Sequence, residues 1–299
     1  MCGIAGLIAR EKVDIGLTIV DMLNKLKHRG RDSTGLAVYE DRKDIQIKVA
    51  MNKGELQPRL ESMISKYGKI SKEKSYPSIG GYLFFEASVD MDENKISELH
   101  KEIDRDLELC VHHFGRRIKV YKDIGDAGDL QGHYDFHGIY GTHGIGHVRL
   151  ATESVENINF AHPFVSYLYS DLAIVHNGQL TNYFNMRRKM ERLGIQFKTY
   201  NDSELIAHYL AYQMTELKRD FEGALWGGLE VFDGVFTFLA STPKYIGVVR
   251  DKLAIKPVLF YESEDKLFLF GSEQTCMAPV REDIFATEMH PGGVRVWSI

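Results

Sequence analysis

The C-terminal third of the chain is a series of short apolar segments separated by short turns. This pattern restricts the fold more than any other feature of the 299-residue sequence. Apolar segments of this length, with turn residues between them, are typical of strands that pair as antiparallel hairpins. The predicted strands cover 235–240, 246–250, 258–261, 266–270 and 294–297. A sheet formed in this way needs a second layer to cover its apolar face.

The rest of the chain supplies helices and further strands. Ile15, Ile19, Met22, Leu23 and Leu26 recur at helical spacing, and the His-Arg-Gly sequence at 28–30 predicts the end of that helix. Other strands are predicted at 2–9, 34–40, 45–51, 143–151 and 165–175, and helices at 182–193 and 203–218. Two helical layers and two strand-rich segments predict an α+β fold, a sandwich with mostly antiparallel sheets.

Residues 52–140 have a different pattern from the segments on either side. The predicted elements are a charged helix at 55–67, an apolar run at 81–85, a helix that contains Ile96, Leu99 and Ile103, and strands between 107 and 121. We therefore expect one domain over 1–299 with a small α+β unit inserted at about 52–140. The apolar run Tyr82–Phe85 is a candidate for contacting a partner, although a core strand of the unit is the better explanation for these side chains alone.

Composition and charge exclude several classes of protein. The chain has 37 Lys and Arg against 42 Asp and Glu, a net charge of −5, and so lacks the basic surface that nucleic-acid binding requires. No apolar run reaches the roughly 18–20 residues of a membrane-spanning helix, and no basic segment of a signal peptide opens the chain. Three widely spaced cysteines favour a reducing compartment over a disulfide framework. We expect a cytoplasmic protein with no nucleic-acid and no membrane partner.

Cys2 has the most unusual position of any reactive residue. If Met1 is removed, Cys2 carries both a thiol and a free α-amine. An α-amine has a pKa of about 7.7–8.0, so it can serve as a general base near neutral pH. One residue then supplies the nucleophile and its base, which is the N-terminal-nucleophile arrangement. Considered alone, Cys2 is better explained as a small buried side chain.

Three other positions each have a structural and a chemical interpretation. Arg149 stands where an apolar strand ends, so its guanidinium fits an ordinary ion pair or a substrate carboxylate. Asn177 and Gly178 form the commonest hairpin-turn pair, and they also fit an oxyanion hole made of a side-chain amide and a backbone N–H. Asp202 lies in a capping sequence at a predicted helix start, and its carboxylate would also suit a substrate ammonium.

Metal and nucleotide binding have little support in the sequence. His133, His137, His143 and His147 have a spacing that can place two ligands on one helix face, but the glycines between 138 and 146 would break such a helix. No cysteine or paired carboxylate completes a ligand set, and no glycine-rich phosphate-binding loop is present. We therefore expect no metal and no cofactor in this chain.

Six segments occur in the order found in class II glutamine amidotransferases, and the chain resembles this family outside 52–140. The segments are Met1–Gly6 (MCGIAG), His28–Gly35 (HRGRDSTG), Gly146–Thr152 (GHVRLAT), Ala161–Phe164 (AHPF), His176–Gly178 (HNG) and Asn201–Glu204 (NDSE). The resemblance implies the fold of the N-terminal-nucleophile hydrolases, a four-layer αββα sandwich. It also implies that L-glutamine is the substrate.

The resemblance implies a role for each matching residue. The catalytic set is the nucleophile Cys2, with its own α-amine as base, and the oxyanion hole of Asn177 and Gly178. The substrate-binding set is Arg149 and Thr152 for the α-carboxylate of glutamine, Asp202 for its α-ammonium group, and His162. Glutamine would be hydrolysed to glutamate and ammonia through a thioester on Cys2. Arg31, Leu150 and Phe160 depart from the family pattern at positions that carry no assigned role.

Within the family the chain resembles the stand-alone amidotransferase subunits of split glutamate synthase and N-methylglutamate synthase systems, which have a comparable insertion. This resemblance implies that ammonia passes to separate synthase subunits. It also implies that FMN and iron–sulfur centres are found only in those partner subunits. The sequence leaves the oligomeric state open, with a homo-oligomer among the options.

Two other functions fit parts of the same sequence. A stand-alone N-terminal-nucleophile amide hydrolase would use Cys2 without a partner, but Arg149 together with Asp202 favours an amino-acid substrate. A glutamine sensor or scaffold would keep Met1, which blocks the α-amine of Cys2. The intact mass of the chain from its native host distinguishes these cases, because catalysis requires the loss of one methionine.

Overall fold

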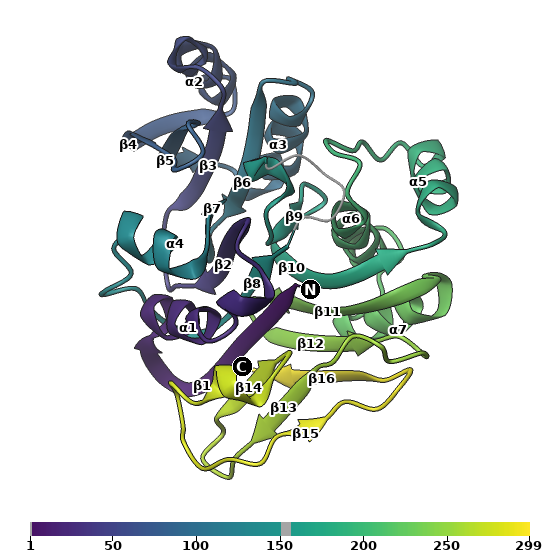
Figure 1. Cartoon of the computed structure of the whole chain (residues 1–299). Coiled ribbons are helices and arrows are strands. Elements are labelled where there is room, and N and C mark those ends of the chain that lie inside the picture. Colours follow the sequence, from purple (N-terminus) through teal and green to yellow (C-terminus); the bar gives the residue numbers. More distant parts are fainter. Residues whose placement is uncertain (1, 151–156) are drawn as a thin grey trace.

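The computed structural model describes residues 2–150 and 157–299, and it arranges their strands in three antiparallel sheets (Figure 1). The seven-stranded sheet has the order β15 (Thr287–Glu288), β13 (Leu259–Glu262), β14 (Phe268–Gly271), β1 (Gly3–Asp14), β8 (Tyr140–Arg149), β2 (Ser33–Tyr39) and β7 (Ile118–Ile124). The five-stranded sheet has the order β16 (Val294–Ser298), β12 (Tyr245–Arg250), β11 (Gly234–Thr242), β10 (Tyr169–Leu180) and β9 (Phe164–Ser166). The four-stranded sheet has the order β4 (Gly68–Pro77), β5 (Leu83–Met91), β3 (Ile45–Met51) and β6 (Leu109–Gly115).

Helices cover the outer faces of these sheets. On the seven-stranded sheet lie α1 (Ile15–Asn24) and α4 (Ala127–His133). On the five-stranded sheet lie α6 (Asp202–Thr215) and α7 (Phe221–Val231), with α5 (Tyr183–Arg192) packed against α6. On the four-stranded sheet lie α2 (Gln57–Ser65) and α3 (Ile96–Asp104). Short 3₁₀ turns occupy Lys27–Arg29, Gly54–Leu56, Glu93–Lys95, Ile158–Phe160 and Gln274–Met277.

The two larger sheets pack face to face and form the centre of the molecule. Their shared core consists of apolar side chains from both sheets, among them Ile4, Val175, Leu239, Phe270 and Trp297. Each of these sheets alternates inward and outward side chains, so its other face is left for helices to cover. The resulting order is helix, sheet, sheet, helix, which confirms the predicted α+β sandwich with four αββα layers. β1 begins beside β10, where the two sheets meet (Figure 1).

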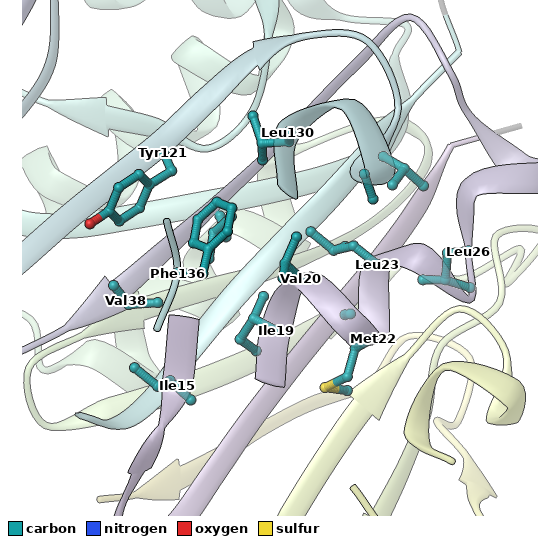
Figure 2. Packing of buried hydrophobic residues seen from close by; sticks show 14 of the residues in the cluster. Ile15, Ile19, Val20, Met22, Leu23, Leu26, Val38, Tyr121, Leu130 and Phe136 are labelled. Atoms are coloured by element: carbon teal, nitrogen blue, oxygen red, sulfur yellow. The ribbon is translucent and has the colours of Figure 1, made fainter. Parts of the chain in front are cut away.

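The apolar face predicted for the first helix is buried as expected. Figure 2 shows Ile15, Ile19 and Leu23 of α1 packed toward Phe136 and Leu130. The helix itself ends at Asn24 rather than at 28–30, and a 3₁₀ turn over Lys27–Arg29 follows it. Leu26 and Arg29 are both buried, and a spacing of three residues places both on one side of a 3₁₀ turn.

The four-stranded sheet differs in its bounds from the insertion expected at 52–140. β3 is a central strand of this sheet, because it pairs with β5 on one side and β6 on the other. β7 instead pairs with β2 along its whole length in the seven-stranded sheet. The chain leaves and re-enters that sheet at neighbouring positions, since the Glu40 N–H donates to the Arg117 carbonyl at 2.9 Å. We call residues 41–116 the inserted unit; the domain division of the chain stays a prediction.

The apolar run Tyr82–Phe85 lies at the start of β5. Phe84 and Phe85 are fully buried, and they join the cores on either side of the four-stranded sheet. For Phe84 and Phe85 the core-strand interpretation is therefore right and a contact with a partner is wrong. Tyr82 and Leu83 are partly exposed, so for them the partner contact stays a prediction.

Candidate active site

One cleft of about 560 Å³ contains most of the predicted site residues. Cys2, Arg149, His162, Gly178 and Asp202 line it. They come from the position just before β1, the end of β8, the segment before β9, the end of β10 and the start of α6. Asn177 contacts this group through a hydrogen bond to Cys2. Thr152 lies outside the described residues. The two large sheets and α6 thus bring together residues that are far apart in the sequence.

Cys2 is half-buried and is held mainly through its backbone. Its carbonyl oxygen accepts hydrogen bonds from Asn177 Nδ2 and Arg29 Nε, each at 3.0 Å. Its Sγ lies 3.5 Å from the backbone nitrogen of Leu150. The other two thiols, on Cys110 and Cys276, are buried, and burial raises the pKa of each to about 12. Cys2 is therefore the thiol that reaches the cleft.

Asn177 and Gly178 lie inside a continuous strand, so the hairpin-turn interpretation is wrong. β10 runs through both residues, and they pair with Thr237 and Phe236 of β11. Gly178 has a φ of 144°, and a Cβ there would lie 2.0 Å from the Val235 carbonyl oxygen. Only glycine fits this position. The strand continues through the Asn-Gly pair, from the apolar Ile174 and Val175 before it to Leu180 after it.

The backbone N–H of Gly178 points away from β11. Its partner Phe236 donates its own N–H to the Asp251 carboxylate and accepts from the Asp251 N–H, both on the far side of β11. In an antiparallel ladder such a pair does not exchange backbone hydrogen bonds. The Gly178 N–H is therefore directed to the side of β10 opposite β11. One N–H of the Asn177 side-chain amide donates to the Cys2 carbonyl. The same NH₂ group carries a second N–H donor.

Asp202 is the first residue of α6, and its carboxylate is bound at both oxygens. Its Oδ2 accepts the Leu180 N–H at 3.0 Å, and its Oδ1 lies 3.5 Å from His176 Nδ1. Burial alone would raise the pKa of Asp202, but His176 and the backbone donors outweigh burial and lower it. The helix cap is Asn201, whose Oδ1 accepts the Ser203 N–H at 2.8 Å. The carboxylate is thus ionised and is not used as the cap.

His162 reaches the site through a serine and rests on another histidine. Its Nε2 lies 2.8 Å from Ser203 Oγ, and its ring stacks on His147 with 4.0 Å between ring centroids. Burial lowers the pKa of His147 to about 3 and that of His162 well below its usual value. Both rings are therefore neutral at physiological pH, so stacking them causes no charge repulsion.

Three of the four histidines considered for metal binding, His133, His143 and His147, make other side-chain contacts. His133 Nε2 lies 3.0 Å from the Pro77 carbonyl, and His143 Nε2 lies 2.9 Å from the Thr242 carbonyl. His147 packs on His162. Within residues 2–150 and 157–299, no group of three or more His, Cys, Asp or Glu side chains is arranged to hold a metal ion.

Arg29 and Glu273 are site residues that the sequence interpretation missed. Arg29 is buried at 9% exposure, donates to the Cys2 carbonyl, and pairs with Glu273 Oε1 at 2.5 Å. The sequence interpretation treats His28–Gly30 as the end of a helix and as part of a family segment, and it assigns no role to Arg29. The available signal was the spacing of three residues between the apolar Leu26 and Arg29, which can direct both side chains inward. A buried cation needs a carboxylate or a carbonyl as its partner.

Comparison with known proteins gives a consistent result. A family model described as a glutamine amidotransferase domain matches residues 147–279. The chain is 31% identical to a protein of Methanothermobacter thermautotrophicus that is provisionally named a glutamine amidotransferase, and the alignment covers 100% of both chains. It is 33% identical to a glutamine amidotransferase-like protein of Rhizobium meliloti, GlxB, over 99% of this chain and 98% of the other.

Solved structures with the same fold include the glutamine phosphoribosylpyrophosphate amidotransferase of B. subtilis. The two structures superpose with a TM-score of 0.61 at 18% identity, over 99% of this chain and 47% of the other. At this level of identity the similarity shows a common fold. No helix in the described part of the chain is both long and apolar enough to cross a membrane.

Proposed function

This chain belongs to the class II glutamine amidotransferase family, and on that premise we propose that it releases ammonia from L-glutamine for a separate synthase subunit. The observation that carries the proposal is the position of Cys2. Its carbonyl is bound by Asn177 and Arg29 at 3.0 Å each, and its thiol shares a cleft with Arg149 and Asp202. A nucleophile, an anion-binding group and a cation-binding group are what hydrolysis of an amino-acid amide requires.

The glutamine head group would be bound by two opposite charges. The Arg149 guanidinium suits the α-carboxylate, because a planar fork can bind both of its oxygens. The ionised Asp202 suits the α-ammonium group, and its lowered pKa keeps it charged at neutral pH. Thr152 and His162 complete the proposed substrate-binding set. These contacts leave the side-chain amide of glutamine directed toward Cys2.

Hydrolysis would proceed in two steps once Met1 has been removed. The Cys2 thiol gives its proton to its own α-amine, and the sulfur forms a bond to the amide carbon. Asn177 Nδ2–H and the Gly178 N–H stabilise the resulting oxyanion. The protonated α-amine then gives its proton to the leaving nitrogen, so ammonia departs and a thioester remains. Water, deprotonated by the α-amine, cleaves the thioester to glutamate and restores the thiol.

The partner is proposed to be a synthase of the glutamate synthase type, which would hold the FMN and the iron–sulfur centres. Free ammonia is mostly protonated at neutral pH and is then a poor nucleophile, so a direct passage between subunits would protect it. The inserted unit, residues 41–116, adds a sheet to the αββα layers and is the part that we assign to this contact. The proposed location is the cytoplasm, where glutamine and reduced thiols are both present.

The test measures glutamate and ammonia released from glutamine by the purified chain with a native N-terminus. We expect equal amounts of both products, no release by Cys2→Ala, and normal release by the matched control Cys110→Ala. Adding the synthase subunit is expected to raise the rate. Hydrolysis by Cys2→Ala would contradict the catalytic proposal. An unchanged rate with the synthase would contradict the partner alone, and retained Met1 with glutamine binding but no turnover would support the sensor.

A further inference from the structure

We infer that Ser203 and His162 are positioning residues, which hold the Asp202 carboxylate for the α-ammonium group of glutamine through the hydrogen-bonded series His162–Ser203–His176–Asp202. The inference rests on the proposed function, because it concerns how the ammonium site is kept in place. Ser203 is assigned no bond to the substrate. His162 lines the cleft as part of the proposed substrate-binding set, and the role inferred here is its action on Ser203.

The Ser203 hydroxyl is the centre of this series. Ser203 Oγ lies 2.8 Å from His162 Nε2, 2.9 Å from His176 Nδ1 and 3.5 Å from Asp202 Oδ1. The other three members of the series are buried, with exposures of 1% for Ser203, 6% for His162 and 3% for His176. A hydroxyl has one proton, so it donates to one of these groups and accepts from another.

The charge on Asp202 decides the direction of the hydrogen bonds. A lone pair on His176 Nδ1 would be repelled by the ionised carboxylate oxygen 3.5 Å away, so Nδ1 carries a proton. Ser203 therefore accepts from His176 and gives its own proton to His162 Nε2. The buried, neutral His162 ring can accept it there, because its own proton is then on Nδ1. His162 thus determines where the Ser203 proton lies.

His162 is itself fixed to the seven-stranded sheet. The buried Lys122 of β7 donates its Nζ to the carbonyls on either side of His162, to Ala161 at 3.1 Å and to Pro163 at 3.3 Å. A Cβ on Gly35 of β2 would lie 2.2 Å from the His162 carbonyl oxygen, so the backbones touch at this point. The series therefore connects a point fixed to one sheet with a carboxylate at the start of α6.

The expected consequence is selectivity for the α-amino group. Leu180 N–H fixes one oxygen of Asp202, and His176 with Ser203 fixes the other. With both oxygens held, the remaining lone pairs keep a constant direction toward the cleft. If Ser203 Oγ is removed, His176 loses its other partner and the carboxylate can rotate. Recognition of the ammonium group should weaken, while the reactivity of the Cys2 thiol should not change.

The test compares two diazoketones that alkylate Cys2, one with the full amino-acid head group of glutamine and one without its α-amino group. The rate constant for alkylation is measured by intact mass, so it does not depend on turnover or on a partner. We expect the wild-type chain to prefer the reagent with the amino group. Ser203→Ala and His162→Leu should reduce this preference by about tenfold or more, the size of one charge-assisted hydrogen bond. For Ser203→Ala, the rate with the reagent that lacks the amino group should stay the same.

His162→Gln should keep the preference, because its amide oxygen stands near the place of Nε2 and can accept the Ser203 proton. The comparison of His162→Leu with His162→Gln also tests the inference if Ser203→Ala fails to fold. Ser166→Ala is the matched control: Ser166 is 2% exposed, and its Oγ lies 2.8 Å from His208 Nδ1, on the same helix as Asp202. It should leave the preference unchanged.

The result with Asp202→Asn separates failure of this inference from failure of the proposed ammonium site. If Asp202→Asn keeps the wild-type preference, the proposed role of Asp202 is wrong. If Asp202→Asn loses the preference but Ser203→Ala and His162→Leu keep it, only the positioning role is overturned. Equal losses in His162→Leu and His162→Gln would also overturn it, because a lost acceptor would then not be the cause.

Discussion

Asn177 has two hydrogen-bonding tasks within one amide group. One N–H binds the Cys2 carbonyl at 3.0 Å, and the other is available for the oxyanion that we propose. Asp202 differs from Asn177 in this respect, because its carboxylate would contact only the head group of the substrate. The two residues therefore affect different kinetic constants.

Asn177→Ala is expected to lower kcat by roughly 10²–10³, the loss found when an oxyanion donor is removed. Asp202→Asn and Arg149→Lys should mainly raise KM, since they bind the head group equally in the ground and transition states. Steady-state glutaminase kinetics on the three variants make the comparison. A kcat for Asn177→Ala within a few-fold of wild type would show that the amide only holds Cys2.

Gly178→Ala is expected to destabilise the protein and to remove glutaminase activity. A φ of 144° is unfavourable for alanine, and the added Cβ would meet the Val235 carbonyl oxygen at 2.0 Å. We expect a loss of about 1–3 kcal/mol in the free energy of unfolding, measured with urea. Gly132→Ala in α4 is the control, because its Cβ would meet nothing within 4 Å. A normally stable Gly178→Ala variant would contradict the backbone geometry.

Among the elements, β3 places one side chain, Lys48, between the inserted unit and the seven-stranded sheet, where its Nζ lies 3.5 Å from the Val120 carbonyl oxygen of β7. Lys48 is buried at 1% exposure, with the ammonium 4.1 Å from the centre of the Phe84 ring. Tyr121 of β7 and Tyr134 also face it. Burial lowers the pKa of Lys48 to about 7. Glu86, on the neighbouring strand β5, forms ion pairs with Lys74 and Lys119. It therefore keeps two cationic partners when Lys48 is replaced.

The buried lysine predicts a stability that rises with pH between about 7 and 9. In this range the unfolded chain holds a proton on Lys48, whose usual pKa is about 10.4, and the folded chain does not. The free energy of unfolding should therefore increase by up to about 1.4 kcal/mol per pH unit from this residue. Lys48→Met, which fills similar space, should remove that increment. Urea unfolding of both proteins at pH 7 and pH 9 measures it, and identical pH slopes would contradict the prediction.

The sequence predicted elements better than it predicted their partners. The strand at 45–51 was predicted from its alternation, but alternation does not tell which sheet a strand joins, and β3 belongs to the inserted unit. The helix α7 was missed because Gly223, Gly227 and Gly228 lower its helix propensity, which burial against the five-stranded sheet overrides. The Asn-Gly pair indicated a turn that strand pairing replaced.

The site was predictable mainly through the order of six short segments, since each residue alone had an ordinary structural explanation. Cys2, Arg149, His162, Gly178 and Asp202 do line one cleft. Contacts that depend on tertiary structure could not be foreseen. Arg29 on the Cys2 carbonyl and Ser203 between two histidines join segments more than 25 residues apart, and no local pattern marks such pairs.

For the molecule as a whole, the two large sheets must keep a fixed alignment. Cys2 precedes β1 of one sheet, and Asn177 lies on β10 of the other, so the hydrogen bond between them crosses from sheet to sheet. The side chains that keep the sheets apart, such as Leu239, are fully buried. The distance between Cys2 and Asn177, the proposed nucleophile and oxyanion donor, therefore depends on packing in the shared core.

Leu239→Ala is expected to reduce the free energy of unfolding by about 2–5 kcal/mol and also to lower kcat. Leu60→Ala is the matched control, because Leu60 is equally buried but lies in the core of the inserted unit. It should cost similar stability and leave kcat unchanged. Urea unfolding and glutaminase assays at a temperature where both variants are folded give the two values. Equal kcat values in the two variants would contradict the dependence on sheet alignment.

The close approach of Glu40 and Arg117 bears on how such chains can diversify. Because one backbone hydrogen bond closes the β2–β7 hairpin there, the register of the hairpin is independent of what is attached beyond it. Loop-closure entropy grows only slowly with length, so units of very different size are tolerated at this point. A lineage could exchange the attached unit, and with it the partner contact that we propose for that unit, by recombination at the two ends of the unit, and every cleft residue would stay in place.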